Sequence, residues 1–250
     1  MSIPDITCIR NSRADCRSSR DISRRVDGNP LSVSALGLVC LLAATPWVGA
    51  APAFDVPRLD DVTIDGDTAG WEQAFQIALL IPAQSPLPER ETFSASARLG
   101  WNDDGLLVLA SVVGTGGNES EKLEELWRGD SVELYLAPSP ASPDRCQWVI
   151  APGGSEQFPT TRSFLHDYRQ TAELKKQPAD ITVATRRTAT GYHVKALLPW
   201  SSLGIVPEVG REVACQIMVN RRQDDGGLDH LLWFPMHGAF GDCPIGICFP

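Results

Sequence analysis

The sequence predicts an all-β fold, an antiparallel β-sandwich or jelly roll with one or two short helices. Between residues 54 and 250, about ten short segments alternate apolar and polar residues, as strands with one buried face do. Clusters of Gly, Pro, Asn and Asp separate these segments, and apolar residues at helical spacing are almost absent. Short strands joined by turns, with few helices, are typical of sandwiches and jelly rolls.

The clearest element is a hairpin. Residues 93–101 alternate in polarity, the segment 102–105 reads Asn-Asp-Asp-Gly, and residues 106–113 are apolar. The other expected strands lie at 62–64, 75–81, 131–136, 146–150, 181–185, 192–198, 213–220, 231–234 and 246–249.

Two short segments predict helices. Residues 119–127 are rich in charge, and residues 200–203 follow Pro199, which suits the first turn of a helix. From 153 to 179 the periodicity weakens, and we expect a helical turn or a surface loop at 164–176.

Residues 1–50 are typical of a leader, and residues 54–250 of a single domain. The leader has six arginines and no lysine, followed by an apolar run over 31–48, which is the order of a secretory signal. Cleavage is expected after Ala50 or Ala53, where small residues gather. We therefore expect an exported protein, periplasmic or extracellular, with no membrane association after cleavage.

The charge of the remaining domain excludes two classes of partner. The leader holds six Arg and four Asp, so its removal takes the net charge from −9 to −11. An acidic domain is a poor partner for nucleic acid or an anionic membrane.

Four cysteines remain once the leader is removed: Cys146, Cys215, Cys243 and Cys248. An even number in an exported chain favours two disulfides, with three pairings open. A zinc site is the alternative, but no Cys-x-x-Cys pair is present, so we favour disulfides.

The most informative stretch runs from Trp127 into the strand 131–136. Alternation sends Glu133 and Tyr135 to the face opposite three aliphatic side chains. An indole, a carboxylate and a phenol suit a sugar, because a ring stacks on the sugar's C–H face while the carboxylate accepts hydroxyl protons. The alternative is an edge Trp and a solvent-facing Glu of an ordinary sandwich.

Five motifs follow one another along the chain: Ile64-Asp65-Gly66 with Trp71, and the segments 99–109, 130–136, 191–200 and 213–220. In this order they resemble the family 9 carbohydrate-binding modules and their DOMON-like relatives. The resemblance covers essentially all of residues 54–250. It implies a β-sandwich that binds carbohydrate without catalysis and serves alongside glycoside hydrolases.

The resemblance also implies roles for particular residues. In sugar-binding members, two tryptophans clamp a terminal sugar, and the first lies six residues before the Glu of Asp-Ser-Val-Glu. Trp127 and Glu133 match, so Trp127 would stack while Glu133, with Tyr135, would bind hydroxyls. The second tryptophan has no match, and Phe240 is the candidate substitute. The arginine expected near 146–150 is also missing.

Other functions have weaker support. Acidic turns such as Asp65 with Asp67 would suit structural calcium, but none completes a calcium loop, so we expect no metal. Some DOMON-like relatives hold haem b between their sheets, and the candidate ligands here are Met218, Met236 and His237. Haem is disfavoured because adjacent residues do not readily ligate opposite haem faces. A sandwich that docks other exported proteins remains a further alternative.

An enzyme is not expected. Ser163, His166 and Asp167 lie too close in sequence for a Ser-His-Asp triad, and no nucleophile-elbow motif surrounds the serine.

Overall fold

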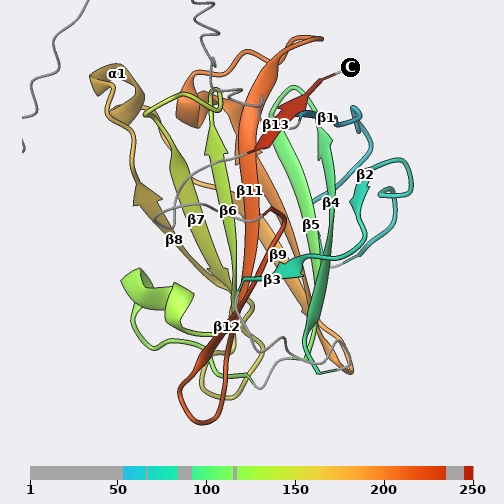
Figure 1. The fold of residues 1–250 in the computed structure, drawn as a ribbon, viewed down its shortest axis with the longest axis vertical. Helices are drawn as coiled ribbons and strands as arrows, with labels where there is room; N and C mark the ends of the chain where they lie inside the picture. Colours follow the sequence, from blue (N-terminus) through green and yellow to red (C-terminus); the bar gives the residue numbers. More distant parts are fainter. Residues whose placement is uncertain (1–52, 66, 84–91, 115–116, 235–244, 250) are drawn as a thin grey trace, which may run out of the picture. The chain divides into compact units, whose positions relative to one another are not determined.

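The computed structural model describes residues 53–65, 67–83, 92–114, 117–234 and 245–249, with only the backbone at 245–248. These residues form two β-sheets packed face to face, with short helices at the ends of the sheets (Figure 1). The expected all-β sandwich is confirmed.

One sheet has eight strands. In sheet order they are β1 (Ala53–Asp55), β13 (Ile245–Cys248), β11 (Glu212–Arg222), β6 (Ser131–Ala137), β7 (Cys146–Ala151) and β8 (Arg162–Asp167). The second half of β11 also pairs with β12 (Leu228–Leu232), which in turn pairs with β3 (Ile81–Pro82). All neighbours are antiparallel except β1 and β13, which run parallel at the edge.

The second sheet has five antiparallel strands. In order they are β2 (Phe75–Ile77), β4 (Ser94–Trp101), β5 (Gly105–Val113), β10 (Gly191–Pro199) and β9 (Thr182–Arg187). The predicted hairpin is β4–β5. Its turn is closed by the Asn102 side chain, whose Oδ1 accepts the N–H groups of Asp104 and Gly105, each at 3.0 Å.

The helices are short. The expected helices at 119–127 and 200–203 are the 3₁₀ segments η1 (Leu123–Arg128) and η2 (Trp200–Leu203). The segment 164–176 holds the one-turn helix α1 (Ala172–Lys175), but its first residues belong to strand β8, which the weak periodicity did not reveal. Among the described residues, no helix has the length and apolar character needed to cross a bilayer.

Four tryptophans fill the space between the sheets, as their aliphatic neighbours indicate. Trp101, Trp148, Trp200 and Trp233 are all buried in one continuous core. Two of them also bond to backbone: the Trp148 indole donates to the Ala179 carbonyl at 2.7 Å and the Trp200 indole to that of Asn102 at 2.8 Å. These two rings stabilise the sandwich without leaving a buried donor unpaired, whereas the buried indole N–H of Trp101 has no hydrogen-bond partner among the described residues.

The outer face of the five-stranded sheet is covered by the chain itself. Leu59 and Trp71 pack on Leu107 and Leu109 of β5. Beside them Lys195 of β10 is buried, and its Nζ lies 2.8 Å from the carboxylate of Asp65. This part of the face is therefore covered, and the buried ammonium of Lys195 beneath the cover is paired.

The structure describes the side chains of two of the four cysteines, Cys146 and Cys215. Cys146 and Cys215 both lie opposite Leu136, on the two sides of β6. Two strand spacings put their Cα atoms roughly 10 Å apart, too far for a disulfide between them. Cys146 is a buried free thiol, and burial raises its pKa to about 12. The expected two disulfides are therefore wrong, because Cys146 forms none. Cys243 and the Cys248 side chain lie outside the described residues, so a disulfide that involves them stays a prediction.

Candidate functional site

The outer face of the eight-stranded sheet carries a buried polar network centred on Glu133. The Glu133 side chain points away from the core, yet the residue is only 1 % exposed. The Tyr135 hydroxyl donates to its Oε2 at 2.6 Å, and the Asn220 amide donates to its Oε1 at 2.6 Å. The Gln147 amide also donates to Oε2. Side chains from β6, β7 and β11 thus converge on one carboxylate.

The electrostatics of Glu133 are unusual. Each donor that the structure shows on this carboxylate is a neutral hydroxyl or amide. Burial raises the pKa of Glu133, while the three hydrogen bonds oppose that shift. A buried acid held by neutral groups costs free energy in the folded state, and such groups gather at functional sites.

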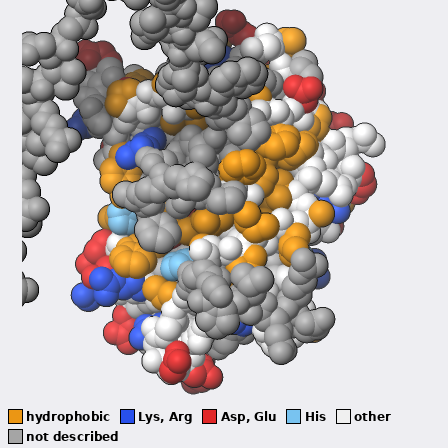
Figure 2. Space-filling model, viewed as in Figure 1, with side chains coloured by type: hydrophobic (Ala, Val, Ile, Leu, Met, Phe, Trp, Pro, Cys, Tyr) orange, Lys and Arg blue, Asp and Glu red, His pale blue; other side chains and the backbone are white. Residues whose placement is uncertain are grey.

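A cavity of about 260 Å³ opens above this network. It is lined by Trp127, Glu133, Gln147, His166, Tyr168, Met218 and His230, and we call it the Trp127 pocket. Figure 2 shows hydrophobic side chains gathered on this side of the molecule, with histidine side chains beside them. A concave site with an apolar wall and a few convergent polar groups is the usual form of a small-molecule site.

Trp127 reaches the pocket from the 3₁₀ segment η1. Leu126, Val149 and Ala151 form a small buried cluster on the outer face, and the indole packs against it together with Phe164. The Arg128 guanidinium lies 4.9 Å from the centre of the indole. The ring is half-buried, so it is fixed in place while part of it faces the cavity.

A row of aromatic rings follows the edge strand β8. His166 lies 4.9 Å from Phe164 in an edge-on arrangement and 6.3 Å from Tyr168 in a stacked one, between ring centres. Tyr168 is 42 % exposed and lines the pocket. It supplies a second aromatic side chain to the pocket that Glu133 lines.

His230 extends the network from β12. Its Nδ1 lies 2.6 Å from Asn220 Oδ1. The amide of Asn220 donates to Glu133 and to Ser131, so its Oδ1 is the accepting atom and Nδ1 of His230 carries a proton. Burial lowers the pKa of His230, which favours the neutral ring. In that tautomer Nε2 is an acceptor.

The structure brings two of the expected site residues together in one cavity, Trp127 and Glu133. Tyr135 is fully buried beneath Glu133 and orients it, so its hydroxyl serves the carboxylate. Phe240 lies outside the described residues.

Sequence reasoning missed five lining residues: Gln147, His166, Tyr168, Met218 and His230. A signal existed for Gln147, because an amide inside the apolar strand 146–150 marks a polar position on the outer face. Tyr168 had no such signal, since it follows a strand that the pattern did not reveal.

The described residues give little support for haem or calcium as a ligand. Met218 lies on the outer face, in the Trp127 pocket, and not between the sheets where a haem would sit. The other two haem candidates, Met236 and His237, lie outside the described residues. In the acidic turns, Asp65 bonds Lys195 and Asp103 forms a bidentate pair with Arg58.

Comparison with protein families identifies the family of this chain. The model of the family "Carbohydrate family 9 binding domain-like" matches residues 64–234. No curated protein matches the chain.

Solved structures show the same fold. A family 9 carbohydrate-binding module from Caldicellulosiruptor kristjanssonii in complex with cellotriose is 16 % identical, with a TM-score of 0.58 over 79 % of this chain and 93 % of that one. The same organism's module in complex with glucose is 18 % identical, with a TM-score of 0.59 over 79 % and 96 %. A candidate carbohydrate-binding protein from Bacteroides uniformis is 10 % identical, with a TM-score of 0.56 over 80 % and 100 %.

At these identities the structural likeness establishes the fold, and the family model, which spans most of the chain, establishes the kinship. The chain belongs to the carbohydrate family 9 binding domain-like family, a family of non-catalytic carbohydrate-binding modules.

Proposed function

We propose that this protein is an exported, non-catalytic module that binds a sugar, or the end of a polysaccharide, in the Trp127 pocket. One observation carries the proposal: a half-buried indole and a buried carboxylate held by neutral donors line the same cavity. The family and the glucose and cellotriose complexes of similar modules support it.

The chemistry of the pocket suits a hydroxylated ring. The Trp127 and Tyr168 rings offer apolar faces for the C–H side of a sugar. A carboxylate has about four lone-pair positions, and three are taken by the donors of Glu133, which leaves one acceptor position for a hydroxyl proton. A charge-assisted bond of this kind is stronger than one between neutral groups.

The size of the pocket indicates how much of the ligand it holds. Pockets for drug-sized ligands usually measure about 300–1,000 Å³. At about 260 Å³, the Trp127 pocket lies just below that range. It has room for one sugar ring, as binding to a chain end requires.

The proposal is tested by titrating the protein, freed of residues 1–50, with glucose and cellotriose in a calorimeter, after a glycan-array screen. Trp127→Ala removes the stacking surface, and we expect affinity to fall about tenfold, since a stacked ring contributes about 1–2 kcal/mol. Leu123→Ala is the matched control, because Leu123 is exposed on the same 3₁₀ segment.

Two results would defeat the site. One is a parent protein that binds no glycan on the array. The other is a Trp127→Ala protein whose affinity equals that of Leu123→Ala.

Export is part of the same proposal. The arginine-rich segment and apolar run within residues 1–50 support it. Fusing residues 1–53 to a reporter that is active only after export should give activity, and deleting residues 31–48 should abolish it. A reporter that stays inside the cell with the intact leader would contradict export.

A further inference from the structure

The hydrogen-bond network beneath the Trp127 pocket donates in one direction, towards Glu133. The ring of His230 donates from Nδ1 to Asn220, whose amide donates to Glu133. The amide nitrogen of Gln147 also donates to the Glu133 carboxylate, which fixes the orientation of that amide, since a carboxylate only accepts. The protons of these side chains are therefore used inside the network.

This side of the pocket consequently offers acceptors to a ligand. His230 keeps Nε2, Gln147 keeps Oε1, and Glu133 keeps one lone-pair position. All three residues line the pocket, and Met218 adds a thioether, which is a weak acceptor. A hydroxyl brings one proton and also needs a donor, whereas an ammonium brings three protons and accepts none. The acceptors of the network therefore match an ammonium better than a hydroxyl.

The charge of the pocket favours the same kind of ligand. Glu133 is buried, and no lysine or arginine is among the described residues that line the cavity. An ammonium beside this carboxylate would supply the opposite charge that its neutral donors do not. The rings of Trp127 and Tyr168 would also attract a cation through their faces.

We propose that the Trp127 pocket prefers a sugar that carries a protonated amine, such as glucosamine, to the corresponding neutral sugar. This inference rests on the proposed function, because it names the class of sugar that the same pocket takes. The amine replaces a hydroxyl of similar size, so the ligand still fills a cavity of about 260 Å³.

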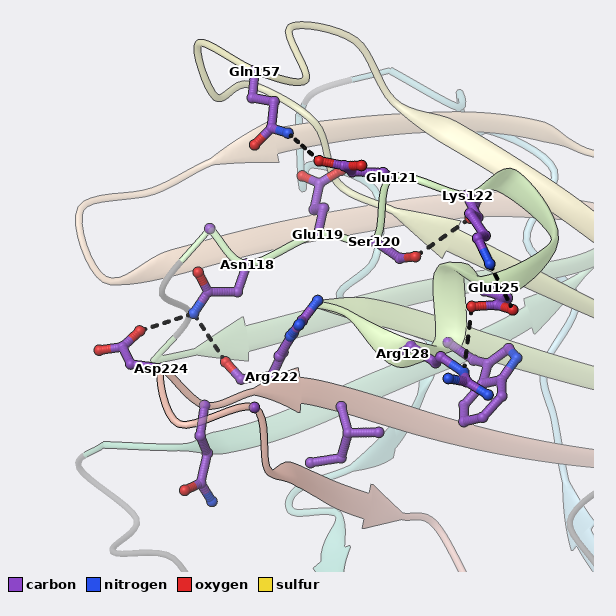
Figure 3. Close-up of a pocket in the computed structure, with 15 residues that line it drawn as sticks. Asn118, Glu119, Ser120, Glu121, Lys122, Glu125, Arg128, Gln157, Arg222 and Asp224 are labelled. Carbon is purple, nitrogen blue, oxygen red and sulfur yellow. Dashed lines mark hydrogen bonds and ion pairs between the residues drawn. The ribbon is translucent and has the colours of Figure 1, made fainter. Parts of the chain in front are cut away.

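Two guanidinium groups lie near the pocket without lining it. That of Arg128 lies 4.9 Å from the centre of the Trp127 ring, and that of Arg145 lies 5.6 Å from the centre of the Tyr168 ring. Arg128 is paired with Glu125 of the same 3₁₀ segment at 3.5 Å (Figure 3). Its charge is therefore offset within η1, and it does not use the acceptors of the network.

One variant removes the charge on which the preference depends. Glu133→Gln keeps the shape of the side chain but offers no negative charge to an ammonium. Glu124→Gln is the matched control, because Glu124 is exposed on η1 and its loss changes the net charge of the protein by the same amount.

The experiment titrates the parent and both variants with glucosamine, glucose, N-acetylglucosamine and ethanolamine, at a pH about one unit below the pKa of the free amine. We expect the parent and the control to bind glucosamine about tenfold more tightly than glucose. N-acetylglucosamine, whose nitrogen is neutral, should gain nothing over glucose, and ethanolamine, which lacks the ring, should bind far more weakly. In Glu133→Gln the ratio of glucosamine affinity to glucose affinity should fall to about one.

A pH series on the parent tests the same point without any variant, and it decides the matter if Glu133→Gln does not fold. At about one unit above the pKa of the amine, the ratio of the two affinities should also fall towards one. Glucose measured at each pH is the reference. The pKa values of His166 and His230 are lowered by burial, so both rings stay neutral over this range.

The outcomes separate this inference from the proposed function. A parent that binds glucose and glucosamine equally overturns the inference and preserves the proposed function. A preference that survives Glu133→Gln or the rise in pH, or an equal gain for N-acetylglucosamine, also overturns it, because the charge would then not be its cause. Ethanolamine binding as tight as that of glucosamine overturns it as a sugar preference. Binding of none of the sugars defeats the proposed function, and the inference with it.

Discussion

Among the described residues, each outer face of the sandwich has a buried charged side chain in a central strand, and the partners of the two charges are of opposite kinds. On the five-stranded sheet, Lys195 is held by the carboxylate of Asp65 at 2.8 Å and by the carbonyl of Thr63 at 3.3 Å. On the eight-stranded sheet, the described donors to Glu133 are all neutral. Both residues occupy the same kind of outward position in a central strand.

On the proposed function, the difference separates a charge that holds the fold together from one that is available to a ligand. A buried charge with an opposite charge beside it stabilises the covering segment, here the turn that contains Asp65. A buried charge held by neutral dipoles keeps part of its interaction capacity for another group. A buried charge is therefore not by itself a sign of a ligand-binding site. The charge of the groups that hydrogen-bond to it is the more informative feature.

Loss of Lys195 tests the structural half of this comparison. Lys195→Ala removes the buried stem and the ion pair, and we expect it to cost about 3 kcal/mol of unfolding free energy, a fall in Tm of roughly 6–12 °C. Sugar affinity measured below the transition should not change. Lys195→Met keeps the stem and should cost far less, because Asp65 is half exposed and can be hydrated. A Lys195→Ala protein of parental Tm would contradict the structural role.

Glu133→Gln tests the functional half. The variant removes the negative charge but keeps the shape. The Tyr135 hydroxyl can turn to accept a proton from the new amide, and the Gln147 amide, which also donates to Oε2, can flip to present its oxygen. We expect affinity for glucose to fall about thirtyfold, or about 2 kcal/mol, while unfolding free energy changes by less than about 1 kcal/mol. Calorimetric titration and thermal unfolding measure the two quantities. A large loss of stability with intact binding would reverse the roles of Glu133 and Lys195.

Tyr135→Phe sharpens the assignment of Tyr135 as an orienting residue. It removes one 2.6 Å hydrogen bond to Glu133, so affinity should fall about fivefold, a loss of about 1 kcal/mol. In Glu133→Gln the same change should have almost no further effect, because the two residues act through one contact. Equal and additive losses would instead indicate that Tyr135 contacts the ligand directly.

The two faces should also respond to acid in opposite ways. The ammonium of Lys195 lowers the pKa of Asp65, so the stability from this pair is present above the ordinary carboxyl value and is lost as pH falls through the lowered pKa. Burial raises the pKa of Glu133, so as pH falls the folded state binds this proton at a higher pH than the unfolded state does. Protonation removes the cost of burying the charge, and Glu133 therefore contributes more to stability in acid.

Binding should weaken over the same range in which Glu133 gains its proton. Between neutral pH and the ordinary glutamate value we expect affinity to fall about twofold or more. His166 and His230 line the same pocket, and burial lowers the pKa of both. Each therefore gains its positive charge at a lower pH than an ordinary histidine does. A pH series of titrations on the parent and on Glu133→Gln isolates the carboxyl, because the variant should show a flatter profile. Identical profiles would exclude Glu133 as the titrating group.

Much of the fold could be predicted from local patterns, because alternation and turn residues act over a few positions. The β4–β5 hairpin and the strand of Glu133 are examples. The convergence of Gln147 and Asn220 on Glu133 could not, since it depends on β7 and β11 flanking β6 in one register. Strand β8 was missed because its two faces are both half-covered, which weakens the alternation. Tyr168, the second aromatic side chain of the pocket, follows this strand and was therefore missed as well.

The buried thiol of Cys146 offers a way to measure how often the eight-stranded sheet opens. It lies on β7 next to Gln147, with its thiol in the core and the amide of Gln147 in the site. Because burial raises its pKa to about 12, an alkylating reagent finds little thiolate and no path to it while the sheet is closed. The rate of its alkylation therefore reports how often β7 separates from its neighbours. A bound sugar should slow the alkylation, and the slowing should grow with the free energy by which the ligand stabilises β7 in the sheet.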